Sequence, residues 1–399
     1  MGLSATFRYL SPATRLYAGV DALSHLSREV QRLEASRAFV VCSQTVAQTT
    51  NLLNRTKDTL EDLCVGVYDE AKKESPIPLV LAGVEAARAV HPDLIVAVGG
   101  GSAVVTARAI TILLAEEGTV HDLCTTYPPG EAPVSPRLLE PKLPNILVLT
   151  TPTTGANRGG AAVMDDKPPY RLELFDPKAR PACIILDGQA LLTAPLSLYL
   201  DTSITTFMGL VGALQSPNLN PLSYSDLRQA LELSLTFLPQ LVAHPEDPDV
   251  RIQLGVASVL ANRAADSPSG GGRGINTTLD KQIRYRYKQV GQGASRAVLL
   301  AAEMRRNREI LVTGQARLAE VMGLSKEGMS DLVSAEAATQ GLVDFLQSIG
   351  VPARIRDLRM PEDDLQAIAE ADAAQPSFGE SGHRITDVGE LLQFLREAW

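Results

Sequence analysis

The alternation of short apolar runs with helical patterns is the feature that most constrains the fold of this chain. In the first half, β-branched runs of four or five residues alternate with segments that carry apolar residues at helical spacing. This alternation is typical of a parallel sheet, because parallel neighbours need a long crossover connection, usually a helix. The predicted strands are 38–42, 94–98 and 146–149, and a helix is predicted over 46–53.

The second half has a different pattern. From about residue 189 the strand-like runs end, while apolar residues at helical spacing continue. We therefore predict an α/β dinucleotide-binding-like domain over 1–188 and a helical domain over 189–399, with the active-site cleft between them. A glycine-rich segment, 267–274, is expected to form a loop at that cleft. The predicted helices are 198–214, 224–241, 250–265, 296–310, 314–322, 330–349 and 365–371.

Composition narrows the function classes. Of the 399 residues, 45% are hydrophobic, a value typical of a globular protein. The net charge of -9 argues against a surface that binds nucleic acid or anionic lipid. The four cysteines are far apart, without metal-ligand spacing, which favours a reducing compartment. With no apolar run long enough for a membrane helix, we expect a cytoplasmic protein that acts on a small molecule, without nucleic-acid or membrane partners.

A glycine turn is the sharpest local signal. Gly99, Gly100, Gly101 and Ser102 come directly after a predicted buried strand and directly before a helical pattern. Glycines let the backbone approach a pyrophosphate, and a helix start offers unpaired N–H groups to it. A strand-to-helix glycine turn also has a purely structural interpretation, and both stay open.

A hydroxyl-rich turn, 149–155, follows the next predicted strand. Hydroxyls at the carboxyl end of a strand bind ligand phosphate or amide groups, or cap a turn.

These segments, in this order, resemble the iron-containing alcohol dehydrogenase superfamily, in the branch that includes maleylacetate reductases. The likeness covers nearly the whole chain. The matching segments are 7–9, 15–19, 66–69, 93–102, 152–154, 176–181, 185–187 and 395–399, with Leu299, Leu300, Met304 and Asn307.

The resemblance implies an α/β nucleotide-binding domain, an all-α domain, and a cofactor, NADP or NAD, bound between them. By resemblance, the glycine turn with Ser102 would hold the pyrophosphate, and Thr153 and Thr154 would lie near the nicotinamide. Arg171 matches a family lysine near the cofactor. A homodimer is implied as well.

The metal site of the family is altered. Members that carry iron or zinc hold it with one Asp and three His, and here the matching positions are Asp201, Thr205, Thr278 and Gln292. The family often has an additional histidine, and the matching position here is Gln282. A one-residue insertion in the loop would shift the position at Thr278 to Thr277 and the position at Gln282 to Lys281. The five histidines of the chain lie elsewhere. Because iron and zinc sites rely on imidazole or thiolate ligands, we expect no bound metal.

The nucleotide side departs from the family too. Val105 and Arg108 stand where the family commonly has Asp and Lys, and Ser43 stands where an acidic residue often meets a ribose hydroxyl. Loss of that carboxylate makes NADP easier to admit, and it is also compatible with no dinucleotide binding.

A polar segment, 280–289, takes the place of the lost histidines. In one interpretation Tyr285 or Tyr287, with Lys281 or Lys288, polarises a substrate carbonyl without metal. In the other, the segment is a solvated helix face.

Asp201 has two interpretations as well: a general base or substrate anchor, or the N-cap of the helix that continues through Thr205. On the same predicted helix, Phe207 and Met208 are predicted to be core residues.

Three functions remain open. The first is a metal-independent, NAD(P)-linked oxidoreductase of a carbonyl or enone. The second is a non-redox enzyme, an isomerase, lyase or cyclase, in the same pocket. The third is a non-catalytic ligand-binding homologue, since fold does not fix function.

Overall fold

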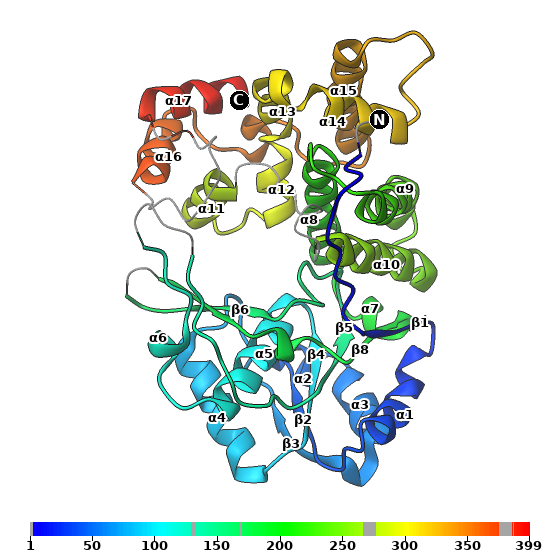
Figure 1. The fold of residues 1–399 in the computed structure, drawn as a ribbon, viewed down its shortest axis with the longest axis vertical. Coiled ribbons are helices and arrows are strands. Elements are labelled where there is room, and N and C mark those ends of the chain that lie inside the picture. The colour runs from blue at the N-terminus through cyan, green and yellow to red at the C-terminus, as the bar shows by residue number, and fades with distance from the viewer. Residues whose placement is uncertain (1–2, 129–132, 168–169, 266–276, 375–384, 386) are drawn as a thin grey trace. The chain divides into compact units, whose positions relative to one another are not determined.

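The computed structural model describes residues 3–128, 133–167, 170–265, 277–374, 385 and 387–399. The chain divides into two compact units (Figure 1). An α/β unit comprises Pro12–Pro195 and Glu246–Val259, and a helical unit comprises Met1–Ser11, Leu196–Pro245 and Leu260–Trp399. The sequence-based division at residue 188 thus differs from the structure in that each unit also takes a segment from the other side of the boundary.

A parallel six-stranded sheet forms the centre of the α/β unit. Its strands are β1 (Arg15–Gly19), β2 (Ala38–Val41), β3 (Cys64–Tyr68), β4 (Leu94–Gly99), β5 (Asn145–Leu149) and β8 (Cys183–Asp187). Their order is β1-β8-β5-β4-β2-β3, and every pairing is parallel. The predicted fold class is confirmed. Three strands of this sheet were not predicted. The edge strands β1 and β3 are partly exposed and do not form a continuous apolar run. Strand β8 is buried along its whole length, but its run at the end of the first half was not assigned to a strand.

A smaller antiparallel pair, β6 (Gly160–Met164) and β7 (Arg171–Phe175), follows β5. The helices of the α/β unit are α1 (Leu26–Arg32), α2 (Gln44–Thr49), α3 (Leu52–Leu60), α4 (Ile77–Val90), α5 (Gly101–Ala115), α6 (Val120–Leu123) and α7 (Gly188–Leu192).

The single helix predicted over 46–53 is wrong. The chain breaks between α2 and α3 at Thr50, whose backbone is extended. The Thr50 hydroxyl donates to the carbonyl of Val46 and accepts from the N–H of Leu52. A threonine that bonds its neighbouring backbone in this way competes with the helix.

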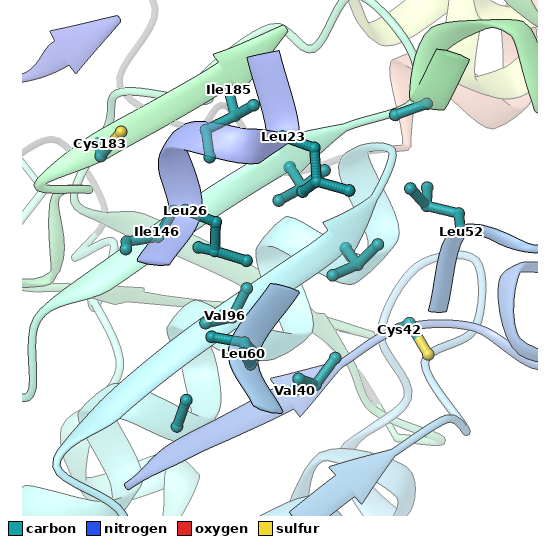
Figure 2. Close-up of a cluster of buried hydrophobic side chains, with 14 of the residues drawn as sticks. Leu23, Leu26, Val40, Cys42, Leu52, Leu60, Val96, Ile146, Cys183 and Ile185 are labelled. Atoms are coloured by element: carbon teal, nitrogen blue, oxygen red, sulfur yellow. The ribbon is translucent and has the colours of Figure 1, made fainter. Parts of the chain in front are cut away.

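The core of the α/β unit explains why its strands read as apolar runs. Alternate residues of β2, β4, β5 and β8 face a cluster of leucines from α1, α3 and the turn before α1 (Figure 2). The intervening strand residues are buried too, so both faces of the sheet are covered. The residues that meet on the side shown are Leu23, Leu26, Leu52, Leu60, Val40, Val96, Ile146 and Ile185.

The helices that follow β2 and β4 cover opposite faces of the sheet. The α3 residues Leu52 and Leu60 belong to the cluster in Figure 2, and no α5 residue does. Instead, α5 packs on α4, where a Cβ added at Gly83 would lie 2.6 Å from Ile110. In open α/β sheets, ligands bind outside the carboxyl ends of strands at such a switch point.

The helical unit shows no strand in its described part. Its helices are α8 (Leu196–Leu214), α9 (Pro221–Ala243), α11 (Thr277–Arg286), α12 (Gln292–Ala297), α13 (Leu300–Arg306), α14 (Arg308–Val321), α15 (Asp331–Ser348), α16 (Asp364–Ala373) and α17 (Val388–Glu397). Helix α10 (Pro248–Ala265) begins in the α/β unit and ends in the helical one. The predicted glycine-rich loop 267–274 lies outside the described residues.

The single helix predicted over 296–310 is also wrong, because α12, α13 and most of α14's first turn share that segment. Breaks at Val298 and Asn307 turn the chain so that buried Leu299 and Leu300 reach the core.

The prediction for Phe207 and Met208 is confirmed: both are buried, and Phe207 packs against Phe345 with ring centroids 5.3 Å apart. Within the described residues, the helices are too short or too polar to cross a membrane.

Candidate functional site

The glycine turn joins β4 to α5 as predicted. Gly99 ends β4 with φ of +146°, a backbone conformation that suits glycine. Gly100 is the N-cap of α5, and no side chain caps this helix. Within the described chain, no side chain accepts from the first-turn N–H groups of Gly101 and Ser102. Such unpaired N–H groups bind phosphate in other proteins.

The threonine turn lies directly beside the glycine turn. The Thr150 N–H donates to the Gly99 carbonyl over 3.1 Å. A Cβ at Gly100 would lie 2.8 Å from Thr151 Oγ1, whereas a Cβ at Gly101 would meet nothing nearer than 3.9 Å. The backbone thus leaves open space at Gly101, next to Thr153.

The other residues that were predicted to contact the cofactor differ in their burial and in their polar contacts. Thr153 is buried and its hydroxyl donates to the Thr151 carbonyl over 3.0 Å, while Thr154 is exposed. Arg171 begins β7, where its half-exposed side chain lies 3.5 Å from the Glu173 carboxylate. Among the described residues, Arg171 forms its ion pair with Glu173 and not with a residue of either turn.

Arg108, on α5, fixes the segment after the threonine turn. Its buried guanidinium donates to the carbonyls of Ala156 at 2.7 Å, Gly160 at 2.8 Å and Gly155 at 3.2 Å. Desolvation by burial, followed by the charges of Arg180 and Arg158, lowers the pKa of Arg108. A neutral set of carbonyls holds this cation.

Ser43 stands where β2 meets α2, on the other side of the switch point. Its hydroxyl caps α2 by accepting from the Val46 N–H over 3.3 Å. The Val46 side chain lies near Gly99, since a Cβ at Gly99 would be 3.9 Å from it. The carboxyl end of β2 therefore carries a hydroxyl, not a carboxylate, beside the glycine turn.

In the helical unit, Asp201 lies inside α8 and caps a different helix. Its carboxylate accepts from three backbone N–H groups at the start of α12: Gln292 at 3.0 Å, Gly293 at 2.9 Å and Ala294 at 3.2 Å. A Cβ at Gly291 would collide with it. The interpretation of Asp201 as the N-cap of its own helix is wrong, since α8 begins at Leu196.

The other positions aligned with metal ligands are also engaged locally. The Thr205 hydroxyl donates to the Asp201 carbonyl over 2.9 Å, one turn earlier in α8. The Thr278 hydroxyl donates to the Asp372 carboxylate over 3.3 Å. Gln292 is half-buried at the start of α12. No group of three or more His, Cys, Asp or Glu that suits a metal occurs among the described residues.

The polar segment divides into buried and exposed parts. Tyr285 is 49% exposed near the end of α11, and Lys288 is exposed beyond it. The Tyr287 hydroxyl donates to Asp364, which also pairs with Arg286 at 2.8 Å. Desolvation by burial and the bond to Asp364 raise the pKa of Tyr287, so this phenol holds its proton firmly.

Asp280 was missed as a candidate residue. It lies on α11 with 0% exposure, and it pairs with Arg284 at 3.2 Å and Arg296 at 3.4 Å. The interpretation of the segment as a solvated face fails at this residue. The i,i+4 spacing of Asp280 and Arg284 indicates such a pair in the sequence, whereas the part played by Arg296 depends on how α12 packs against α11.

Comparisons with known proteins cover both units. The family model described as iron-containing alcohol dehydrogenase matches residues 13–188, and the model of the C-terminal part of that family matches residues 200–399.

Curated relatives match along nearly the whole chain. The NAD-dependent methanol dehydrogenase of Bacillus methanolicus is 23% identical over 393 residues, covering 98% of this chain and 99% of the relative. The 1,3-propanediol dehydrogenase of Citrobacter freundii is 26% identical over 397 residues, covering 98% and 99%.

Solved structures share the fold. An alcohol dehydrogenase from Oenococcus oeni superposes with a TM-score of 0.85 at 20% identity, covering 99% of this chain and 100% of that one. The maleylacetate reductase of Rhizobium sp. strain MTP-10005 gives 0.77 at 21% identity, covering 99% of each chain.

Proposed function

Because this chain belongs to the iron-containing alcohol dehydrogenase family, we propose that it is an NAD(P)-linked oxidoreductase that reduces a carbonyl or enone small molecule without a metal. Dehydrogenases among its curated relatives support the oxidoreductase class. The paired turns after β4 and β5 are the single observation that carries the cofactor assignment.

The residues of these turns fit a dinucleotide. The uncapped start of α5 and the open space at Gly101 suit the pyrophosphate. Arg108 holds the segment after the threonine turn and would keep that loop in place beside the cofactor. Ser43, at the end of β2, favours NADP over NAD because it presents no carboxylate to repel a 2′-phosphate.

A bound nicotinamide supplies hydride to the substrate, and the chain has to orient the substrate and polarise its carbonyl. Lys281 and Tyr285 are the candidates for that donor, since they lie on one face of α11 at i,i+4 spacing. Tyr287 suits this role less well because its hydroxyl already donates to Asp364.

The residues aligned with metal ligands do not fit iron or zinc. The Asp201 carboxylate is committed to three backbone N–H groups, and the other positions aligned with ligands offer two hydroxyls and an amide in place of imidazoles. Such a set is poor in the nitrogen and sulfur ligands that these metals need. No step of the proposed reaction involves a metal, and Asp201 is a structural cap.

The cofactor assignment is tested by titrating the protein with NADPH and NADH and following nicotinamide fluorescence. We expect both to bind, NADPH more tightly. Gly101→Ala adds a methyl group where the phosphates would approach and should weaken binding about tenfold or more, a loss of about 1.4 kcal/mol. Gly209→Ala, at an open position of α8, is the matched control. Failure of both cofactors to bind at millimolar concentration would remove the redox proposal.

The polarising donor is tested with Lys281→Ala, Tyr285→Phe and Tyr287→Phe. Loss of a donor that acts in the transition state lowers kcat and kcat/KM together. We expect this for Lys281→Ala or Tyr285→Phe and a smaller change for Tyr287→Phe. Unchanged kinetics in all three variants would mean that the segment has a structural role and does not polarise the substrate.

A non-redox enzyme is the second candidate function. The observation in its favour is that each unit departs from the family pattern, with a hydroxyl at Ser43 in the α/β unit and no histidine at the ligand positions of the helical unit. An isomerase, lyase or cyclase needs only orientation and hydrogen bonding from the protein. Turnover by a preparation stripped of nicotinamide would favour this function over the first.

A further inference from the structure

A cluster of charged side chains joins α11 to α12 in the helical unit. Asp280 has 0% side-chain exposure, while the side chains of Arg284 and Arg296 are 15% and 18% exposed. The cluster is therefore neither a solvated surface nor fully closed. It adjoins the start of α12, the helix that Asp201 caps.

The charges of this cluster do not balance. Among the described residues, Asp280 is the one carboxylate within ion-pair distance of either guanidinium. The positive charge of Lys281 also acts on Asp280. Within the described part of the chain, two arginines that share one carboxylate leave at least one positive charge without a counter-ion. Such a charge is costly in a poorly solvated place.

Hydrogen bonding in the cluster is incomplete as well. Among the described residues, Asp280 Oδ1, Arg284 Nε and Arg296 Nε are buried and have no hydrogen-bond partner. Desolvation by burial raises the pKa of Asp280, although Arg296, Arg284 and Lys281 oppose the shift. The two buried Nε–H groups call for an acceptor from a ligand, an ion or water, whereas Asp280 Oδ1 calls for a donor.

We propose that Arg284 and Arg296 bind a carboxylate group of the substrate, with Asp280 holding the two guanidinium groups in position. The substrate is then a carbonyl compound that also carries a carboxylate. Guanidinium groups suit this role because their planar N–H pairs match the two oxygens of a carboxylate. This inference rests on the proposed function for the reaction and adds the substrate class.

The binding test needs neither cofactor nor turnover. Purified full-length protein is titrated calorimetrically with succinate and, as a neutral analogue of the same size, with succinamide. We expect succinate to bind in the millimolar range or tighter and succinamide not to bind. Arg296→Gln and Arg284→Gln should each weaken succinate binding about tenfold or more, and Arg296→Lys should lose less.

Arg228→Gln is the control, because Arg228 lies on α9 of the same unit and pairs with Glu232 at the surface. Its succinate affinity should stay unchanged. Circular dichroism of each variant checks the fold, and the two glutamine variants together cover the case in which one of them fails to fold.

Three results would overturn the inference: no succinate binding by the unsubstituted protein, equal affinity in the folded glutamine variants, or inorganic phosphate binding as tightly as succinate. Titration with NADPH on the same preparations separates this inference from the proposed function. Succinate binding without NADPH binding keeps the carboxylate site and removes the redox role. NADPH binding without succinate binding keeps the redox role and removes the carboxylate site.

Discussion

At the level of single residues, Asp201 shows how a side chain aligned with a family metal ligand caps a neighbouring helix. Its position in α8 matches the family's ligand, yet its oxygens accept three backbone N–H groups of α12. Hydrogen bonds to a carboxylate are stronger than neutral ones, and they also satisfy the orphan donors of a helix start. The residue type of the family is kept at this position, and its carboxylate caps a helix of the same unit.

Asp201→Asn should lower the free energy of unfolding by about 1–3 kcal/mol, because an amide offers one acceptor oxygen where the carboxylate offers two. Chemical denaturation of the variant and the parent measures the difference. Asp344→Asn, an exposed change on α15, is the control and should stay within about 0.5 kcal/mol. Equal stability of all three proteins would show that the cap contributes little.

Arg108 makes a similar point in the α/β unit. Arg108→Lys keeps a positive charge but replaces the planar guanidinium that serves three carbonyls. We expect a loss of about 2–3 kcal/mol in unfolding free energy and weaker NADPH binding, because the loop after β5 loses its anchor. Arg28→Lys, exposed on α1, should change neither quantity. An unchanged variant would mean that the loop is held by other contacts.

At the scale of elements, close packing decides which helices can approach one another. Gly314 of α14 lies against the end of α8, where an added Cβ would come 2.6 Å from the Cα of Gln215. Backbone atoms cannot rotate away from such a contact. In contrast, nothing lies within 4 Å of a Cβ at Gly209 of α8.

Gly314→Ala should destabilise the protein by about 1–3 kcal/mol through overpacking. Gly209→Ala should stabilise it by about 0.5–1 kcal/mol, because alanine loses less backbone entropy in a helix. Thermal and chemical denaturation of the pair give the two signs. A stabilising Gly314→Ala would mean that α8 and α14 separate readily.

Strand β1 and helix α1 are connected through buried Glu29, which pairs with Arg32 at 2.7 Å and accepts from Tyr17 at 2.8 Å. Desolvation by burial raises the pKa of Glu29. The hydrogen bonds from Arg32 and Tyr17 and the charges of Arg32 and Arg15 outweigh it and leave that pKa below its usual value of 4.5.

A carboxyl with a lowered pKa in the folded state stabilises the protein above its unfolded pKa, and this contribution is lost as the pH falls through the folded pKa. Glu29→Gln should therefore cost about 1–3 kcal/mol near pH 7, and the difference from the parent should shrink below pH 4.5. Urea denaturation at several pH values measures it. A difference that stays constant with pH would contradict the ion pairs.

At the scale of the whole molecule, the residues around Asp201 suggest a helical unit that is stable without a metal. A metal that binds only the folded state raises stability, and its removal by a chelator lowers the melting temperature. We expect purified protein to contain far less than one iron or zinc per chain and its melting temperature to be unaffected by a chelator. Stoichiometric metal, released with a fall in melting temperature, would refute the proposed metal independence.

The order of the two units and the glycine turn after β4 follow from local sequence. Apolar runs before Gly99 and Thr150 mark buried strands, and glycine next to a helix start marks the turn, because periodicity and backbone freedom are local properties. The helix breaks at Thr50 and Val298 could not be predicted from apolar spacing. At Thr50 a side-chain hydrogen bond to the backbone competes with the helix, and at Val298 a buried turn interrupts it.

Tertiary structure alone decided the partners of the charged side chains. Asp201 and the N–H groups it caps are more than ninety residues apart in the chain, and Asp280 meets Arg296 only because α11 and α12 pack together. A sequence shows which groups are charged. Burial and long-range packing determine which of them are neutralised, and around Arg284 and Arg296 the described residues leave positive charge in excess.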